Sequence, residues 1–186
     1  MMLPPGATIG ILGGGQLGRM LAQAAASLGF DVHVFTDEED SPASRVCART
    51  TVAAYDDLDA LRAFARSVSV VTSEFENVPA ASAEALVSAG VPVWPDPRAL
   101  AVAQDRASEK SFLNAVDVPT VAFAEVNSPA DLEAALTTIP PPAILKTRRF
   151  GYDGLGQARL LQREDAASAW EKIGDRPAVL EAFCPF

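Results

Sequence analysis

The residues best suited to chemistry lie in two glycine-rich segments and two short acidic stretches. The first segment is Gly13-Gly14-Gly15-Gln16-Leu17-Gly18, which matches G-x-G-x-x-G and follows the apolar run 8–12. Glycines permit a tight turn and a close ligand approach, and the N-terminus of the following helix attracts anions. Asp37 lies roughly where a ribose-binding acid sits in dinucleotide sites. Taken alone, this motif favours an NAD-dependent enzyme, with a purely structural glycine turn as the alternative.

The second segment, Gly151-Tyr152-Asp153-Gly154-Leu155-Gly156-Gln157, comes shortly after Lys146, which ends an apolar strand. Its glycines make a mobile loop whose backbone N–H groups can reach phosphate oxygens. Lys146 offers a charge for the same phosphates, and Arg148 and Arg149 add positive charge beside it. A simple hairpin is the alternative, but a hairpin needs neither so many glycines nor a cluster of cations. The pattern therefore predicts a nucleotide-phosphate site.

The acidic stretches each follow a predicted strand. Glu74 and Glu76 come after the apolar run 68–72, at the strand end where doubly wound folds bind ligands. They could accept hydrogen bonds from hydroxyl or amino groups of a small substrate, or they could simply cap the next helix. Glu181 follows the run 178–180, whose backbone could read an adenine edge while the carboxylate binds ribose hydroxyls. A solvated acid at a strand end is the alternative for Glu181.

The elements that must position these residues alternate between strand and helix in the first part of the chain. Near-continuous apolar runs predict strands at 8–12, 31–35, 68–72 and 91–94. Helical patterns cover 16–28, 57–66 and 80–89. Buried strands separated by helices imply a parallel sheet covered on both faces. Pro95-Asp96-Pro97 then marks a boundary between a domain of residues 1–96 and a second of residues 97–186.

The second domain is expected to start with a helix over 98–116 and an extended region from Val118. Ser128-Pro129-Ala130-Asp131 has the cap, the proline and the acid that begin a helix. Further elements are predicted as strands at 143–146, 158–161 and 178–183 and a helix at about 164–173.

Composition excludes several functional classes. The 186 residues carry a net charge of −9, which argues against a general nucleic-acid binder. The single histidine, His33, lies in an apolar run and is expected to be a strand position, so the chain cannot build a zinc site from several histidines, and Cys47 and Cys184 lack metal-ligand spacing. The first residues have no basic, apolar signal sequence, and no apolar run reaches about 18 residues. We therefore expect a cytoplasmic protein with no membrane or nucleic-acid partner.

Four motifs occur together in a recognisable order. They are Gly10–Met20, Glu74–Pro79, Gln104-Asp105-Arg106, and Lys146 with Tyr152–Gln157. Together they closely resemble the motifs of carboxyaminoimidazole ribonucleotide synthases, which belong to the ATP-grasp superfamily, and the resemblance covers essentially the whole chain. It implies an α/β chain with a Rossmann-like, parallel-sheet pre-ATP-grasp domain followed by the first part of an ATP-grasp fold.

The resemblance also implies an activity, the ATP-dependent carboxylation of aminoimidazole ribonucleotide with bicarbonate through carboxyphosphate, in de novo purine biosynthesis. By analogy, the ribonucleotide would contact Gln16, Leu17, Glu74 and Glu76. Tyr152 and Asp153 would be catalytic, beside the imidazole or carboxyphosphate. The residues implied for ATP are Arg106, Lys146, Gly151, Tyr152, Asp153, Gly154, Leu155, Gly156, Gln157, Glu181, Ala182, Phe183 and Cys184.

Enzymes of this family use Mg²⁺ held by acidic residues in the later half of the ATP-grasp fold, and they are considerably longer than this chain. No matching acidic pair is found here, so the metal ligands are expected in a C-terminal part that this sequence lacks. The resemblance therefore implies a ligase whose intact form is a homodimer, and it predicts that the 186-residue chain alone is inactive.

Three alternatives stay open at this point. Formate-dependent glycinamide ribonucleotide transformylase shares the layout, but Gln16 and Tyr152-Asp153-Gly154 favour the carboxylase. The sister family resembles G-x-G-E-L-G and a serine-rich loop instead. An NAD(P)-binding oxidoreductase domain leaves Lys146 and the second glycine loop unexplained. A non-catalytic fragment that binds a ribonucleotide or a partner chain is compatible with the family resemblance.

Overall fold

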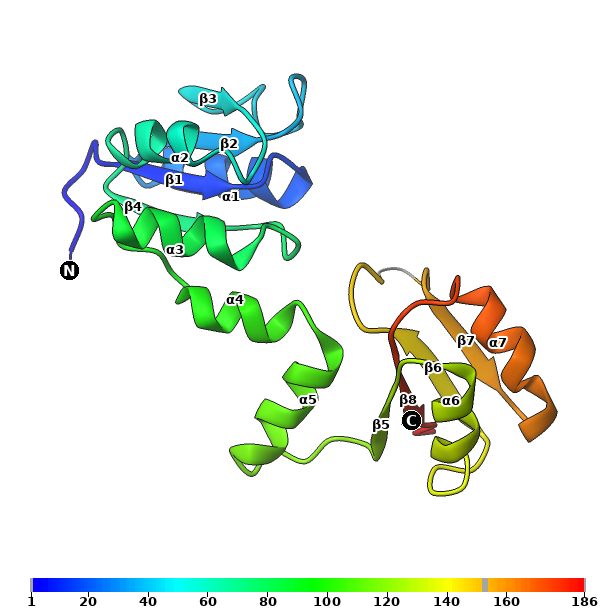
Figure 1. Ribbon diagram of the computed structural model, residues 1–186. Coiled ribbons are helices and arrows are strands. Elements are labelled where there is room, and N and C mark those ends of the chain that lie inside the picture. Colours follow the sequence, from blue (N-terminus) through cyan, green and yellow to red (C-terminus); the bar gives the residue numbers. More distant parts are fainter. Residues whose placement is uncertain (1, 152–153, 186) are drawn as a thin grey trace. The chain divides into compact units, whose positions relative to one another are not determined.

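The computed structural model describes residues 2–151 and 154–185. The chain forms two compact units, residues 1–101 and 102–186, and each is considered by itself (Figure 1). Helix α4 (Pro97–Ala103) runs across the division between them. The sequence-based boundary after residue 96 lies just before this helix, and the limits of the functional domains remain a prediction.

Unit 1 is built on a four-stranded, fully parallel sheet in the order β3-β2-β1-β4. Its strands are β1 (Thr8–Leu12), β2 (Asp31–Thr36), β3 (Arg49–Val52) and β4 (Val70–Ser73). Its helices are α1 (Gln16–Ser27), α2 (Leu58–Ala65) and α3 (Ala80–Ser88). Leu12 pairs in register with Phe35 and with Ser73, so the carboxyl ends of three strands meet at one edge.

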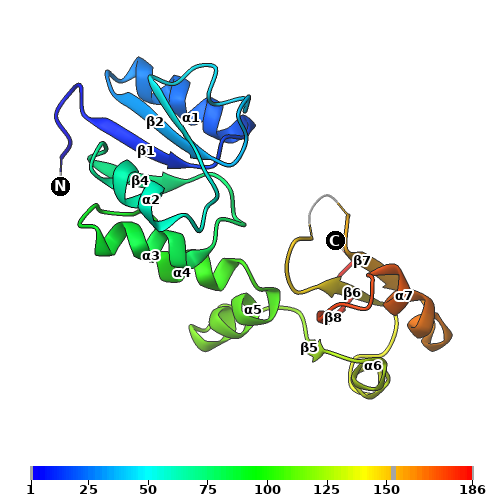
Figure 2. The same cartoon turned by 45° about the horizontal axis from the view of Figure 1, so that its top comes forward.

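Helices cover both faces of this sheet, as the apolar strands predict (Figure 2). One core cluster joins Leu12 and Phe35 to the buried side chains of α2 and α3. The other joins Ile11 and Val34 to Ala22 of α1. Successive strand residues therefore point to opposite faces, and each face packs against a buried apolar core. This doubly covered parallel sheet confirms the predicted fold class.

Two details of unit 1 differ from the sequence-based expectation. Strand β3 was not predicted, because Arg49-Thr50-Thr51-Val52 has no apolar run and forms a largely exposed edge strand. The strand expected at 91–94 is reduced to a single parallel bridge between Val71 and Val93. Edge positions bury little apolar surface, so hydrophobic pattern marks them poorly.

His33 is the only histidine of the chain and is buried inside unit 1. Its Nδ1 lies 2.8 Å from Ser67 Oγ and its Nε2 lies 2.9 Å from Thr51 Oγ1. Burial lowers the pKa of His33 below the model-peptide value of 6.5, and the charge of Arg49 lowers it further. The unfolded chain therefore takes up a proton near pH 6.5 that the folded unit resists.

This pKa shift predicts how the stability of unit 1 depends on pH. The stability that neutral His33 gives to unit 1 should be fully present above pH 6.5. It should be lost as pH falls below that value, because protonation of His33 then favours the unfolded chain. Urea unfolding at about pH 7.5 and about pH 5.5 brackets the histidine and avoids most carboxyl titration. The stability lost between these pH values should be clearly smaller in His33→Gln. An equal loss in both proteins would contradict the prediction.

Unit 2 carries a four-stranded antiparallel sheet in the order β5-β8-β6-β7. Its strands are β5 (Phe123–Val126), β6 (Ala143–Thr147), β7 (Gln157–Leu160) and β8 (Ala178–Ala182). Its helices are α5 (Arg106–Ala115), α6 (Pro129–Ala135), the short 3₁₀ turn η1 (Arg163–Asp165) and α7 (Ala166–Lys172). The strands predicted at 143–146, 158–161 and 178–183 are confirmed to within two residues.

The helix predicted over 98–116 is interrupted instead of continuous. Asp105 has an extended backbone, and its Oδ1 accepts the N–H groups of Ala107 and Ser108. An aspartate in this position begins a new helix, so α4 ends and α5 starts here. The capping residue was visible in the sequence, but the apolar pattern on either side concealed the break.

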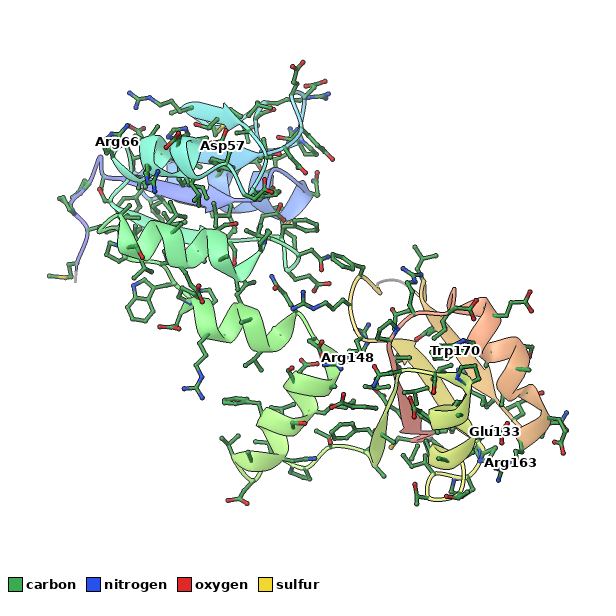
Figure 3. All side chains as sticks on the ribbon, in the orientation of Figure 1. Asp57, Arg66, Glu133, Arg148, Arg163 and Trp170 are labelled. Carbon is green, nitrogen blue, oxygen red and sulfur yellow. The ribbon has the colours of Figure 1, made fainter. Side chains whose placement is uncertain are left out.

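Helices α6 and α7 pack on one face of the unit 2 sheet, over a core that includes Leu145, Leu160, Trp170 and Leu180. Outside this core, Arg163 of η1 bonds to Glu133 of α6 through Nε and Oε2 at 3.0 Å (Figure 3). Because strand side chains alternate, the neighbours of these core residues must point to the other face. That second face carries the candidate nucleotide site. Among the described residues, no helix is long and apolar enough to cross a membrane.

Candidate functional site

The first site lies at the carboxyl edge of the unit 1 sheet, where β1 turns into α1. Glu74 follows β4, and its backbone N–H donates to Leu12 O at 3.0 Å. Its side chain reaches the start of α1, where Oε1 accepts the Gly15 N–H at 2.7 Å. Helix α1 has no acidic residue in its first turn and no side-chain cap of its own. Glu74 therefore supplies the negative charge that a helix N-terminus favours.

The glycine motif makes room for this carboxylate. A Cβ at Gly13 would lie 2.5 Å from Glu74 Oε1, and Gly13 has a φ of +111°. In dinucleotide-binding folds, a pyrophosphate occupies the corresponding place at the helix N-terminus. Here the chain's own carboxylate is in that place, and it would repel a pyrophosphate bound at the N-terminus of α1. This geometry counts against the NAD-dependent alternative.

The other residues predicted for the ribonucleotide lie near the same sheet edge. Gln16 and Leu17 form the first turn of α1 beside Gly15, and both are exposed, Leu17 by 59%. Glu76 is exposed in the loop that follows β4. The structure thus places Gln16, Leu17 and Glu74 together, with Glu76 two residues beyond Glu74. Their contacts with a ribonucleotide remain a prediction.

The second site is a cavity of about 520 Å³ in unit 2. Its lining residues are Val121, Ile144, Lys146, Arg159, Glu181, Ala182, Phe183, Cys184 and Pro185. Ile144 pairs in register with both Glu181 and Arg159, so these side chains share the sheet face opposite the helix-covered core. Lys146 and the segment Glu181–Cys184, both predicted for ATP, therefore converge on one cavity.

Glu181 is buried in this cavity wall and holds two lysines. Its side chain is 8% exposed, Oε2 lies 2.8 Å from Lys146 Nζ, and Oε1 lies 3.3 Å from Lys110 Nζ. Sequence reasoning assigned ribose hydroxyls to this carboxylate and gave Lys110 no role. The sequence contains only weak evidence that Lys110 belongs to this site: it lies four residues after Arg106, on the same face of α5.

The base of the second glycine loop is held by one backbone and one side-chain donor that bond to its carbonyl groups. The Thr147 N–H donates to Gly156 O at 2.8 Å, and Arg106 Nη2 donates to Gly151 O at 2.8 Å. Gly156 has a φ of +68°, and a Cβ there would lie 2.5 Å from Thr147 Oγ1. Arg106, predicted for ATP, thus anchors the loop that carries the other predicted phosphate contacts. Tyr152 and Asp153, predicted as catalytic, lie outside the described residues.

Arg148 does not offer the free positive charge that the sequence suggested. Its guanidinium bonds to Asp105 at 3.0 Å and to Glu125 at 2.8 Å. Burial alone would raise the pKa of Asp105, but hydrogen bonds from Arg148 and from the N–H groups of Ser108 and Ala107 lower that pKa below its ordinary value. The charge of Arg148 is therefore neutralised by Asp105 and Glu125, and these contacts tie the start of α5 to the sheet.

No magnesium site can be assigned within residues 2–151 and 154–185. In these ranges no group of three or more His, Cys, Asp or Glu side chains could hold a metal ion. The described residues therefore assign no ligands to the Mg²⁺ that the resemblance implies.

Comparison with known proteins matches both halves of the chain to domain families. Residues 6–104 match the ribonucleotide synthetase preATP-grasp domain, and residues 111–186 match the ATP-grasp domain. The chain is 46% identical to an N5-carboxyaminoimidazole ribonucleotide synthase of Brucella melitensis, over 99% of this chain and 51% of that protein. It is 47% identical to a bifunctional purine synthesis protein of Dictyostelium discoideum, over 100% of this chain and 19% of that protein.

Solved structures agree with these matches. The ADP complex of an N5-carboxyaminoimidazole ribonucleotide synthetase superposes with a TM-score of 0.93 at 35% identity, covering 99% of this chain and 48% of that chain. The Aspergillus clavatus enzyme with ADP and aminoimidazole ribonucleotide gives 0.85 at 30% identity, with 98% and 48% covered. The chain spans about half the length of these synthase relatives. It belongs to the ribonucleotide synthetase family whose preATP-grasp domain precedes an ATP-grasp domain, and the resemblance carried by its motifs is confirmed.

Proposed function

We propose that this chain supplies the ribonucleotide-binding and ATP-binding parts of an N5-carboxyaminoimidazole ribonucleotide synthase. The whole protein would use ATP and bicarbonate to carboxylate aminoimidazole ribonucleotide through carboxyphosphate. One observation carries the proposal: Lys146 and the Glu181–Cys184 segment, far apart in sequence, line a single cavity of about 520 Å³. The ADP and aminoimidazole ribonucleotide bound by similar structures support this use of the two sites.

The cavity suits a nucleotide on chemical grounds. Val121 and Ile144 provide apolar surface for a purine. The N–H groups of Ala182 and Phe183 already donate to Ala122 O and Pro142 O, so the purine edge would meet the backbone at Cys184. Lys146 supplies a cation for the phosphates. Arg159 lies over the Phe183 ring at 5.5 Å and adds a second positive charge to the lining. Phosphoryl transfer depends mainly on such positioning and charge stabilisation.

The unit 1 site would hold the ribonucleotide. Glu74 bonds to Gly15 through one oxygen, and a carboxylate can accept several further hydrogen bonds from amino or hydroxyl groups. Gln16, Leu17 and Glu76 would complete the contacts. Aminoimidazole already carries a nucleophilic amine, so the chain's task is to orient that amine. Tyr152 and Asp153 are proposed beside the reacting carboxyl group as the resemblance implies.

The remaining attributes of the intact enzyme belong to the same proposal. Mg²⁺ would neutralise phosphate charge when bound, through residues beyond those described. Bicarbonate as co-substrate, a homodimeric assembly and a cytoplasmic location follow from the resemblance. Glycinamide ribonucleotide transformylase shares the layout, and no contact of the described residues favours it.

Cys184 provides a direct test of the nucleotide site, because this exposed thiol lines the cavity. Bound ATP should cover it and slow its alkylation by iodoacetamide. At an ATP concentration ten times Kd, mass action predicts about tenfold protection. Cys47 is the internal control, since its Sγ bonds to Arg49 O in unit 1. Peptide mass spectrometry should show an unchanged Cys47 rate. Equal Cys184 rates with and without ATP would refute the proposed nucleotide site.

A further inference from the structure

Glu181 is shared by two of the three lysines of the chain. Lys146 contacts Oε2 and lines the cavity, whereas Lys110 of α5 contacts Oε1 and is not part of the lining. The Lys110 side chain is only 14% exposed, and its Nζ lies 5.8 Å from the centre of the Phe123 ring. Phe123 is also the β5 residue in register with Glu181. Lys110 is therefore held against this carboxylate by packing as well as by charge.

A charge count shows what Lys110 contributes. A carboxylate and an ammonium in contact have no net charge, so Glu181 alone would cancel the charge of Lys146. That cancellation would weaken the attraction of Lys146 for a phosphate, which depends on net charge in a partly desolvated site. Lys110 contacts the other oxygen of the same carboxylate. The three groups together then carry one net positive charge.

We propose that Lys110 is a positioning residue for the nucleotide: by neutralising Glu181 from outside the cavity lining, it leaves the charge of Lys146 available to the phosphates. This inference rests on the proposed ATP site. Lys110 acts through Glu181 and does not itself touch the ligand. Its effect should therefore depend on the ligand's negative charge and on the presence of the carboxylate.

The first test compares ligands of different charge. Lys110→Met should weaken ATP binding about tenfold by calorimetry, as expected for loss of a partly buried charge near an anion. Adenosine, which has no phosphate, should bind with unchanged affinity. Lys110→Arg should retain most of the ATP affinity, and Lys172→Met, on the exposed end of α7, serves as the matched control. Equal losses for ATP and adenosine would indicate mere structural damage and would overturn the proposal.

The second test removes the carboxylate as well. In Lys110→Met/Glu181→Gln, Lys146 faces a neutral amide, so ATP affinity should recover towards the wild-type value. A purely structural role for Lys110 predicts a further loss in the double variant. Failure of the double variant to recover any affinity would overturn the proposal.

A third measurement decides the inference without ATP. The reagent is an anionic sulfonated succinimidyl ester, which acylates lysines. The rate of acylation at Lys146, divided by the rate at Lys172 in the same protein, reports the attraction of Lys146 for an anion. The relative rate should fall severalfold in Lys110→Met and recover in the double variant. Wild-type protein that binds no ATP would refute the proposed function alone, whereas an unchanged acylation ratio would refute the role of Lys110 alone.

Discussion

Replacing Gly14 with alanine should destabilise unit 1 by about 3 kcal/mol, the cost of forcing extra atoms into a filled interior. A Cβ at Gly14 would lie 2.4 Å from Ser41 Oγ and 2.6 Å from Thr36 Oγ1. Both neighbours are almost completely buried and cannot move into solvent. Gly14 O also accepts the Ala43 N–H at 2.9 Å, which holds the Ser41 segment against the glycine run. The clash therefore cannot be relieved locally.

Gly29→Ala is the matched control for this prediction. Gly29 has a φ of +81° with no atom within 4 Å of an added Cβ, so alanine there should cost only about 1 kcal/mol of backbone strain. Urea unfolding, with hydrogen exchange of the β1 and β2 amides, measures both variants. Ser41→Gly removes the closest clashing atoms and should restore part of the stability of Gly14→Ala. Equal costs at Gly14 and Gly29 would show that crowding by Ser41 is not the cause.

The Gly14 case shows what a local motif can predict. The G-x-G-x-x-G motif allows any residue at the position of Gly14, so the motif alone does not predict that glycine is needed there. The requirement arises from Ser41, which the fold brings to this turn from beyond β2. The motif correctly predicted the turn between β1 and α1, but its ligand could not be read from the glycines. Glu74, which follows β4, bonds to Gly15 and counts against a pyrophosphate at this turn.

The elements that were predictable are those whose own sequence determines their burial. Strands β1 and β2 were evident because both of their faces are covered and both contain short runs of Ile, Leu, Val and Phe. Strand β3 is an exposed edge, and α4 and α5 are separated only by the cap at Asp105. Neither feature changes the hydrophobic period, so the pattern could not reveal them.

The candidate site also had a part that the sequence could predict and a part that it could not. Lys146 and the Glu181–Cys184 segment could be proposed from motifs, and the register of β6 with β8 explains why they share a cavity. The charge balance was not predictable, because the relevant pairs join separate elements. Asp105 and Glu125 neutralise Arg148, while Lys110 reaches Glu181 from α5. Pairing of this kind depends on tertiary structure, which a single sequence does not display.

The ribonucleotide side of the proposal depends most on Glu74. Glu74→Ala should weaken binding of aminoimidazole ribonucleotide by about 10- to 100-fold, the usual effect of losing a hydrogen bond to a charged group. It should also lower the stability of unit 1 by about 1 kcal/mol, because the Gly15 N–H loses its acceptor at the start of α1. Calorimetry and urea unfolding separate the two effects. Glu84→Ala, on the exposed side of α3, is the control.

Glu74→Gln separates charge from shape at the same position. The amide oxygen can still accept the Gly15 N–H, so stability should stay close to that of the wild type. Ribonucleotide affinity should nevertheless fall, because a neutral amide accepts a hydrogen bond from an amine less strongly than a carboxylate does.

NAD should not bind the wild-type protein, since Glu74 occupies the place of its pyrophosphate beside Gly13. Wild-type affinity in Glu74→Ala, or binding of NAD at unit 1, would contradict this assignment of the site.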